Sequence, residues 1–272
     1  MSTTFTIFGS RGYIGSHLAA YLRESTDHIV QVDSALPLTK KLGHVFYCIG
    51  VTTDFARRLH DTMIAHVSKV VDVLDNHHFK SFTYLSSTRV YERGNSGEES
   101  AALTVDPASL ADFYKISKIA GEAVCLNHPS PTVRVARLSN VVGWEQPAMT
   151  FVPSLIRDAL QNRQIVLRTS PDSAKDYILI EDVMKALVLM ALHGRERIYN
   201  VSSGIQITHR DIAACISASL ACQWQADASA SVASFPQTPA TRLRAEFGFD
   251  PCRILDRLPG LCSRYANLAA PP

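Results

Sequence analysis

The stretch of residues 6–18 reads TIFGSRGYIGSHL and contains three regularly spaced glycines, Gly9, Gly12 and Gly15. The residues before Gly9 are β-prone, and those after Gly12 carry apolar side chains at helical spacing. The pattern therefore predicts a tight turn between a strand and a helix. Free N–H groups at such a helix N-terminus, with the positive end of the helix dipole, form a site for phosphate. The predicted cofactor-binding residues of this turn are Gly9, Ser10, Arg11, Gly12, Tyr13, Ile14 and Gly15.

Each glycine has a separate part in this prediction. Gly9 allows the turn, Gly12 lets a pyrophosphate approach the backbone, and Gly15 lets the helix pack closely on the strand. A second β-prone run, residues 29–33, ends at Asp33, about 20 positions further on, where a dinucleotide fingerprint places an acidic residue. A carboxylate there binds the adenosine ribose and repels a 2′-phosphate, which favours NAD over NADP. The alternative interpretation is an Asp that caps an ordinary loop.

The composition describes a globular chain of one large or two closely coupled domains, with 272 residues, 46% of them hydrophobic and 19% charged. A net charge of +2 does not favour nucleic acid or an anionic membrane as a partner. The six cysteines form no Cys-x-x-Cys pair, and the histidines show no metal-ligand spacing, so no metal site is predicted. The start of the chain has no secretory signal, and no apolar run is long enough to span a bilayer, so we expect a cytoplasmic protein.

Strand and helix patterns alternate through the first two-thirds of the chain, which predicts βαβ units and a parallel sheet with helices on both faces. The expected strands in this part are 5–8, 29–33, 44–50, 82–85 and 132–138, and the expected helices are 13–22, 55–76 and 106–126. The pattern becomes mixed from Trp144 onward. There we expect helices at 151–162, 181–193, from 208, and at 242–247, with strands at 164–168, 175–180 and 197–201.

Three polar side chains in the second half of this βα pattern suggest chemistry. Tyr114 and Lys118 are four residues apart on one predicted helix, so their side chains share a face. An ammonium group beside a phenol lowers the phenol pKa from about 10 toward neutral pH, which makes Tyr114 a candidate general acid or base. Ser87 lies at the carboxyl end of a predicted parallel strand, where such folds bind ligands. Alone, a Tyr and a Lys on a solvated helix face would be the simpler interpretation.

With these residues the chain resembles the extended short-chain dehydrogenase/reductases, the nucleotide-sugar epimerase, dehydratase and reductase group. The motifs that carry the resemblance are, in chain order, Gly9-x-x-Gly12-x-x-Gly15, Ser86-Ser87-Thr88-Arg89-Val90-Tyr91, Tyr114-x-x-Ser117-Lys118-x-x-x-Glu122, residues 137–143, residues 175–183 and residues 199–204. The resemblance implies a Rossmann-type doubly wound parallel sheet with a smaller, partly discontinuous C-terminal α/β substrate domain. The implied dinucleotide-binding domain is 1–143, with 169–202 returning to it, and 144–168 and 203–272 form the substrate-binding part.

The resemblance also implies roles for single residues. Lys118 is expected to hold the nicotinamide ribose, and Ser87 to bind the reacting oxygen. The implied cofactor contacts outside the turn are Asp33, Cys48, Ile49, Gly50, Tyr114 and Lys118, and the implied substrate contacts are Ser87, Thr88, Asn140, Lys175 and Arg168. Three of these assignments keep an alternative: residues 48–50 as a simple buried strand end, Asn140 as a side chain that fixes a loop, and Lys175 as a solvated charge.

Departures from the family pattern decide among its activities. Residues 34–43 leave no room for the usual third strand, which reduces the adenine pocket. An Arg-x-Gly-Asp element is absent between 229 and 241, where Arg168 or Arg242 would have to compensate. Thr88 and Arg89 stand where the sugar 4,6-dehydratases have Asp and Glu, so a dehydratase ranks lower.

The sequence therefore predicts an NAD(H)-dependent ketoreductase acting on a carbonyl of a sugar, and the resemblance implies that this sugar is a nucleotide-linked (deoxy)sugar. The second interpretation is a 4-epimerase with tightly bound NAD, and one of another class is a dinucleotide-binding sensor without turnover. As partners we expect a small-molecule sugar, no nucleic acid and no membrane. Relatives also suggest a homodimer that pairs through the helices near 55–76 and 106–126.

Overall fold

The fold is built on a large parallel sheet with strand order β2-β1-β3-β4-β5-β9. The structure is a computed structural model and describes residues 2–33, 41–146, 149–227 and 229–269. The strands of this sheet are β1 (Thr3–Phe8), β2 (His28–Val32), β3 (His44–Tyr47), β4 (Ser81–Ser87), β5 (Val133–Leu138) and β9 (Ile198–Val201). This arrangement confirms the predicted Rossmann-type sheet. The expected lack of a strand after β2 concerns mainly residues 34–40, which lie outside the described residues.

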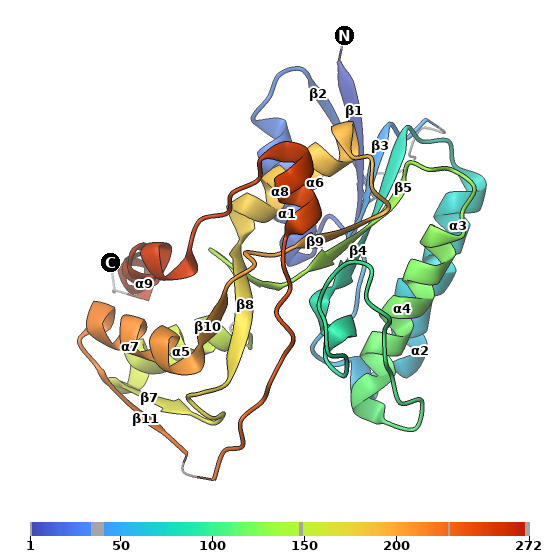
Figure 1. Cartoon of the computed structure of the whole chain (residues 1–272). Helices are drawn as coiled ribbons and strands as arrows, with labels where there is room; N and C mark the ends of the chain where they lie inside the picture. The colour runs from blue at the N-terminus through green and yellow to red at the C-terminus, as the bar shows by residue number, and fades with distance from the viewer. Residues whose placement is uncertain (1, 34–40, 147–148, 228, 270–272) are drawn as a thin grey trace.

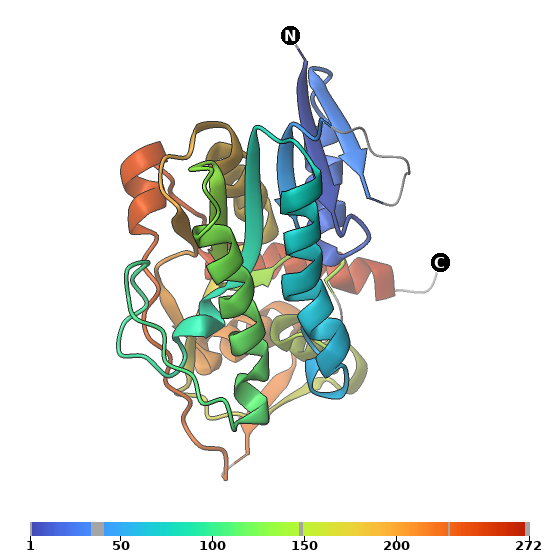
Figure 2. The same cartoon turned by 90° about the vertical axis from the view of Figure 1, so that its right-hand side faces the viewer.

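Apolar side chains alternate between the two faces of the sheet. On β3, Phe46 packs with the first layer of helices, whereas Val45 and Tyr47 pack with the second. The first layer contains α1 (Tyr13–Arg23) and α6 (Ile180–His193), and the second contains α2 (Leu59–Met63), α3 (Lys69–Asn76) and α4 (Phe113–Leu126). Figure 2 shows α3 and α4 in front of the sheet, with α1 and α6 behind it. Because both faces of the sheet carry apolar side chains, helices cover both, and the result is a three-layer domain.

The strand order reverses at β1, which has β2 on one side and β3 on the other. In open parallel sheets, ligands bind beyond the carboxyl ends of the strands at such a point. Here β1 runs directly into the glycine turn, and Cys48 follows β3 and donates its backbone N–H to Phe8 O at 2.8 Å. The topology therefore brings the glycine turn and residues 48–50 to one edge of the sheet.

A smaller α/β part covers that edge (Figure 1). Two short sheets, β10-β8-β6 and β11-β7, pack with three helices around a separate apolar core. Its elements are β6 (Asn140–Val142), α5 (Phe151–Asn162), β7 (Gln164–Leu167), β8 (Ala174–Leu179), β10 (Gln206–Thr208), α7 (His209–Leu220), β11 (Gln223–Ala226) and α9 (Ile254–Ala269), and α8 (Thr241–Phe247) packs near β9. The sequence prediction contained no helix at α9. The segment 169–202 was expected to return to the dinucleotide-binding domain. Its strand β9 lies in the large sheet, whereas its strand β8 lies in a small sheet.

The predicted helix 55–76 is confirmed over residues 59–76, but its predicted start was wrong and a π turn interrupts it. A 3₁₀ turn (η1, Phe55–Arg57) precedes α2, and a π-helical turn (η2, Ile64–Ser68) separates α2 from α3. A π turn widens a helix by one residue and is frequent at functional sites. Here it carries His66, which is fully buried. Helical spacing of apolar residues continues through the segment, so the sequence pattern does not indicate the π turn.

The predicted helix start at Asp106 was also wrong. The helix α4 begins at Phe113, after a 3₁₀ turn (η4, Leu110–Asp112). The carboxylate of Asp112 is buried and accepts hydrogen bonds from Asp106 N at 3.0 Å and from Arg93 Nε at 2.5 Å. Lys115 pairs with the same carboxylate at 2.7 Å. Asp106 instead accepts a hydrogen bond from Ala108 N and so stabilises a local turn in the loop.

Within the described ranges, no helix is sufficiently long and apolar for a membrane span.

Candidate active site

The glycine turn has the geometry that a pyrophosphate needs. Gly9 has φ of +83°, and a Cβ built on it would lie 2.7 Å from Ile49 N, so only glycine fits. Gly12 is the N-cap of α1 and makes no side-chain cap, and Arg11 and Gly12 are exposed. The first N–H groups of α1 therefore face the outside of the turn without a capping side chain. This is the arrangement of a helix N-terminus that binds phosphate.

Asp33 lies directly against the same turn. Its carboxylate accepts hydrogen bonds from Gly9 N at 2.7 Å and from Ser10 Oγ at 2.8 Å. Asp33 is therefore more than a cap of its own loop, because its carboxylate joins the end of β2 to the glycine turn. A partly buried carboxylate at this position fits the hydroxyl groups of an adenosine ribose and repels a 2′-phosphate. The turn and Asp33 together fit a bound NAD.

Replacing Asp33 by Asn is expected to lower the ratio of NADPH to NADH dissociation constants by about tenfold or more. The variant loses a charge that bonds ribose and no longer repels the 2′-phosphate, and a hydrogen bond to a charged group is worth roughly 1.5–3 kcal/mol. Fluorescence titration with NADH and NADPH measures both constants. Asp27→Asn, an exposed carboxylate at the other end of β2, is the matched control. An unchanged ratio in D33N would contradict the assignment.

Lys118 connects the turn to the remaining candidate residues. Its side chain is 4% exposed, and Nζ donates to Leu85 O at 2.9 Å. A Cβ built on Gly50 would lie 3.6 Å from Lys118 Nζ, so glycine at this position keeps the approach to the ammonium open. Burial lowers the pKa of Lys118 to about 8, while Glu122 opposes this shift. The ammonium therefore lies close to Leu85 of β4 and to Gly50, where a nicotinamide ribose would reach it.

Tyr114 points into a cavity beside this lysine. The residue is 5% exposed and lines a space of about 530 Å³. Its hydroxyl group is hydrogen-bonded to the side chain of Ser87. Burial raises the pKa of Tyr114, and Arg89 and Ser87 oppose that rise only in part. The expectation that Lys118 lowers the phenol pKa toward neutrality was therefore wrong for the chain without ligand, because desolvation outweighs the neighbouring charges.

His66 is a residue of this site that was not among the predicted site residues. Its Nε2 accepts a hydrogen bond from Val51 N at 3.1 Å, so Nδ1 carries the proton and donates to Ser117 Oγ at 2.8 Å. The Ser117 hydroxyl in turn donates to Tyr114 O at 2.7 Å. The His66 ring also meets the Tyr114 ring edge-on at 5.6 Å. The π turn thus places His66 where it holds both α4 and the strand end at Val51.

This histidine predicts a loss of stability in acid. Burial lowers the pKa of His66 to about 3, whereas the unfolded chain keeps a value near 6.5. Below pH 6.5 the unfolded state binds more protons, so stability falls as the pH falls toward 3. Between pH 7 and pH 5 the free energy of unfolding of the His66→Asn variant is expected to fall by about 2 kcal/mol less than that of the unchanged protein. Urea unfolding at both pH values measures this difference, and equal losses would contradict it.

A buried ion pair supports the strand that ends at Ser87. Glu122 accepts from Arg137 Nη2 at 2.6 Å and from Ser86 Oγ at 2.5 Å. Arg137 Nη1 also donates to Tyr91 Oη at 2.7 Å, and that hydroxyl donates to Asn200 Oδ1 at 2.8 Å. These groups are all buried. The network therefore connects α4, β4, β5 and β9 directly beneath the candidate site.

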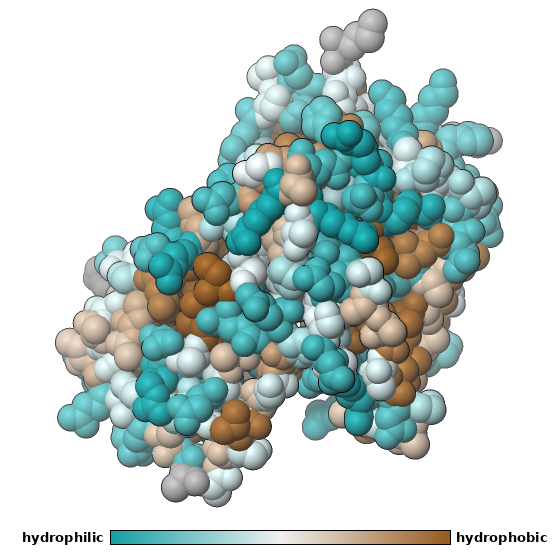
Figure 3. All heavy atoms as spheres, in the orientation of Figure 1, coloured by the Kyte–Doolittle hydropathy of each residue, from teal (hydrophilic) through white to brown (hydrophobic). Residues whose placement is uncertain are grey.

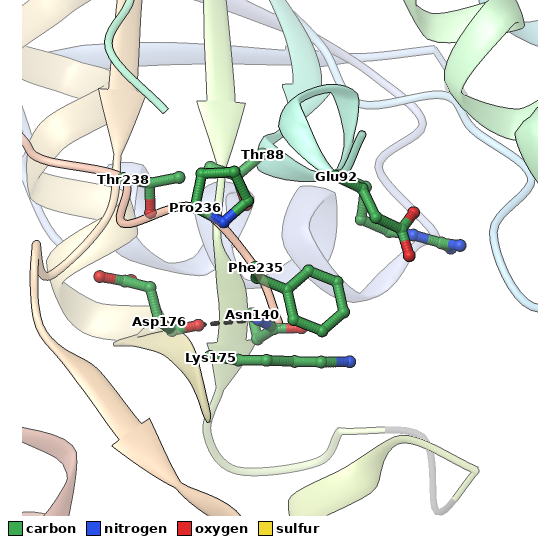
Figure 4. Close-up of a pocket in the computed structure, with 9 residues that line it drawn as sticks. Thr88, Glu92, Asn140, Lys175, Asp176, Phe235, Pro236 and Thr238 are labelled. Atoms are coloured by element: carbon green, nitrogen blue, oxygen red, sulfur yellow. Dashed lines mark hydrogen bonds between the residues drawn. The ribbon is translucent and has the colours of Figure 1, made fainter. Parts of the chain in front are cut away.

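Four of the five predicted substrate contacts lie near Tyr114. Ser87 bonds Tyr114, and a second cavity of about 370 Å³ is lined by Thr88, Asn140 and Lys175 (Figure 4). Both cavities include Asn140, whose amide donates to Asp176 O at 2.7 Å and thereby fixes the strand end. The surface is hollowed between the lobe of α7 and β11 and the lobe of α2 and α4 (Figure 3).

Arg168 is the predicted contact that the structure does not bring to the site. It is exposed at the end of β7 and lines neither of the two cavities. Arg242, the other candidate, donates to Ile198 O at 2.9 Å and pairs with Glu196. Both arginines were chosen because a diphosphate partner was missing from the sequence pattern. The positions of Arg168 and Arg242 depend on how β7 and α8 pack in the tertiary structure, which the spacing of residues in the sequence does not predict.

The sequence model of the NAD dependent epimerase/dehydratase family matches residues 5–202, which include the glycine turn, the Tyr114 helix and all strands of the large sheet. The chain belongs to that family. Membership in the NAD dependent epimerase/dehydratase family confirms the predicted resemblance, and NAD is the cofactor of the family.

Individual relatives are distant. The chain is 21% identical over 265 residues to a protein of Dictyostelium discoideum described as dTDP-D-glucose 4,6-dehydratase, covering 76% of this chain. The chain spans 60% of the length of that relative. Among solved structures, the NAD dependent NDP-hexosamine 5,6-dehydratase TunA aligns over 98% of both chains with a TM-score of 0.81 and 19% identity. A UDP-glucuronic acid 4-epimerase from Bacillus cereus aligns over 98% of this chain and 100% of its own, with a TM-score of 0.75 and 16% identity. These likenesses establish the fold.

Proposed function

We propose that this protein is an NAD(H)-dependent ketoreductase that acts on a carbonyl of a nucleotide-linked sugar. The observation that carries the proposal is that Tyr114 lines the cavity of about 530 Å³ and bonds Ser87, one helical turn from Lys118, whose ammonium lies close to Gly50. The relatives described above are named for nucleotide-sugar reactions, which supports this substrate class. When bound, NADH supplies the hydride.

Side chains of the protein would bind and protonate the oxygen of the reacting carbonyl. Tyr114 is protonated at neutral pH, because burial raises its pKa, and a protonated phenol can give its proton to a carbonyl oxygen. Ser87 donates a second hydrogen bond to the same oxygen. Lys118 holds its ammonium beside the path of the cofactor ribose. The reverse reaction would return the proton to Tyr114 by the same route.

The second candidate is a 4-epimerase, since it needs the same three residues and returns the hydride to the same substrate. A dehydratase receives less support, because Thr88 and Arg89 offer no carboxylate beside Ser87. Native mass spectrometry of the purified protein separates the candidates. A site without retained cofactor, together with NADH oxidation on keto-sugars, is expected for a reductase. Retained NAD that survives dilution would favour the epimerase.

A homodimer in the cytoplasm belongs to the same proposal. Leu59, Val71 and Leu110 are large apolar residues with 40%, 38% and 54% exposure, and all three lie on the segments 55–76 and 106–126. Exposed apolar side chains on adjacent helices support pairing of two copies through this face. Sedimentation velocity is the test, and a monomer at micromolar concentration would remove the dimer from the proposal.

A further inference from the structure

Arg89 is a charged side chain of the site to which no role has been assigned so far. It belongs to the 3₁₀ turn η3 (Thr88–Tyr91) that follows β4, and the buried Val90 and Tyr91 anchor this turn. The Arg89 guanidinium carbon lies 5.0 Å from the centroid of the Tyr114 ring. Stacking on an aromatic face fixes a guanidinium group while its N–H donors stay free for a ligand. Arg89 is therefore held directly beside the proposed proton donor.

Arg89 also lies where the two cavities meet. It lines the cavity of Tyr114, about 530 Å³, and the neighbouring cavity of about 370 Å³. The second cavity contains Lys175, whose Nζ lies 4.4 Å from the centroid of the Phe235 ring. In Figure 4 the Lys175 chain runs alongside Phe235, and its ammonium points away from the Asp176 carboxyl group. A ligand that reaches from Tyr114 into the second cavity must pass Arg89.

The second cavity is lined by two cations, Arg89 and Lys175, and by two carboxylates, each of which has other partners. Glu92 pairs with Lys115 at 3.0 Å. Asp176 accepts hydrogen bonds from Ser203 N at 2.9 Å and Ile205 N at 3.0 Å. In the described part of the chain, neither Arg89 nor Lys175 forms an ion pair within 4.0 Å.

The two cations are close enough to affect each other. Burial and the neighbouring Arg89 lower the pKa of Lys175. An anion between them would relieve this repulsion and would gain charge-assisted hydrogen bonds from both side chains. The position of Arg89 and Lys175, which have no ion-pair partner within the described residues, thus favours a negatively charged group close to the reacting carbon.

We propose that the substrate is a sugar acid, a nucleotide-linked sugar whose ring carries a carboxylate next to the reacting carbon, and that Arg89 binds this carboxylate. The inference rests on the proposed function, because Tyr114 defines where the reacting carbon lies. A carboxylate on the ring carbon adjacent to the reacting carbon reaches Arg89 while the carbonyl oxygen faces Tyr114. A diphosphate on the anomeric carbon lies across the ring from a C4 carbonyl, on the side of Lys175.

The test compares two ligands that differ only in this carboxylate. UDP-glucuronate and UDP-glucose are titrated by calorimetry into the NAD-bound Tyr114→Phe variant, which keeps the aromatic ring under Arg89 but cannot turn substrate over. UDP alone is the third ligand. We expect UDP-glucuronate to bind at least tenfold more tightly than UDP-glucose, and Arg89→Gln in the same background to remove this preference. Arg253→Gln, an exposed arginine before α9, is the matched control and should keep it.

The outcomes separate the possible anions. Loss of affinity for UDP and UDP-glucose in R89Q, as large as the loss for UDP-glucuronate, would show that Arg89 binds the diphosphate and would overturn the inference. Equal affinity of the two sugars before substitution, or no binding of either, would overturn it as well. Turnover of neutral sugars by the unchanged protein would leave the proposed function intact in that case. A carboxylate preference without turnover would instead contradict the proposed function alone.

Discussion

Turnover by the Tyr114→Phe variant is expected to fall by a factor of about 10² to 10⁴, while the variant still binds NAD. The substitution removes only the hydroxyl group, which lies in the cavity and bonds Ser87. General acid–base catalysis by a positioned side chain contributes a factor of this size. The ring stays in place against Phe55 and His66, so packing is kept. Steady-state rates of NADH oxidation on keto-sugars and a titration with NADH measure the two effects separately.

The control for this experiment removes a phenol hydroxyl elsewhere. Tyr21 lies near the end of α1, far along the helix from the glycine turn, and Tyr21→Phe should retain full turnover. Unchanged turnover in Y114F would show that Tyr114 does not move the proton and would favour the sensor interpretation. Loss of NAD binding together with turnover would indicate a structural role of the hydroxyl group.

The Arg137→Met variant is expected to lower the free energy of unfolding by about 3–5 kcal/mol. The substitution leaves the Glu122 carboxylate, 2% exposed, without its ion-pair partner. A buried charge without a partner costs far more than the intact pair contributes. Arg137 also supports Tyr91 at 2.7 Å, so the turn that carries Arg89 loses an anchor. Urea unfolding followed by far-UV circular dichroism measures the loss.

A double variant decides whether the unpaired charge is the cause. Glu122→Met combined with Arg137→Met removes both charges, and apolar replacement of a buried pair is often nearly neutral. We expect the double variant to regain most of the stability that R137M loses. Arg253→Met is the surface control. A double variant as unstable as the single one would show that packing of the Arg137 chain, rather than charge pairing, stabilises this region.

The large sheet was predictable because its signal is local. Its strands are short, nearly continuous apolar runs, such as residues 44–47, because helix layers cover both faces of the sheet. The helix α9 was missed because its apolar residues are interrupted by Pro259 and charged side chains, and only the core shared with α7 selects the helix. The π turn at His66 and the start of α4 at Phe113 depend on buried partners far away in the chain.

Residue spacing was sufficient for the parts of the site that lie within one turn or one helix. The strand-to-helix turn at Gly9 and the shared face of Tyr114 and Lys118 follow from backbone geometry over a few residues. The tertiary structure alone decided which charges meet: it raised the Tyr114 pKa by burial, placed Arg89 beside the ring and left Arg168 outside. The physical reason is that desolvation and Coulomb interaction depend on distances through space, which segments far apart in the chain establish only when they pack.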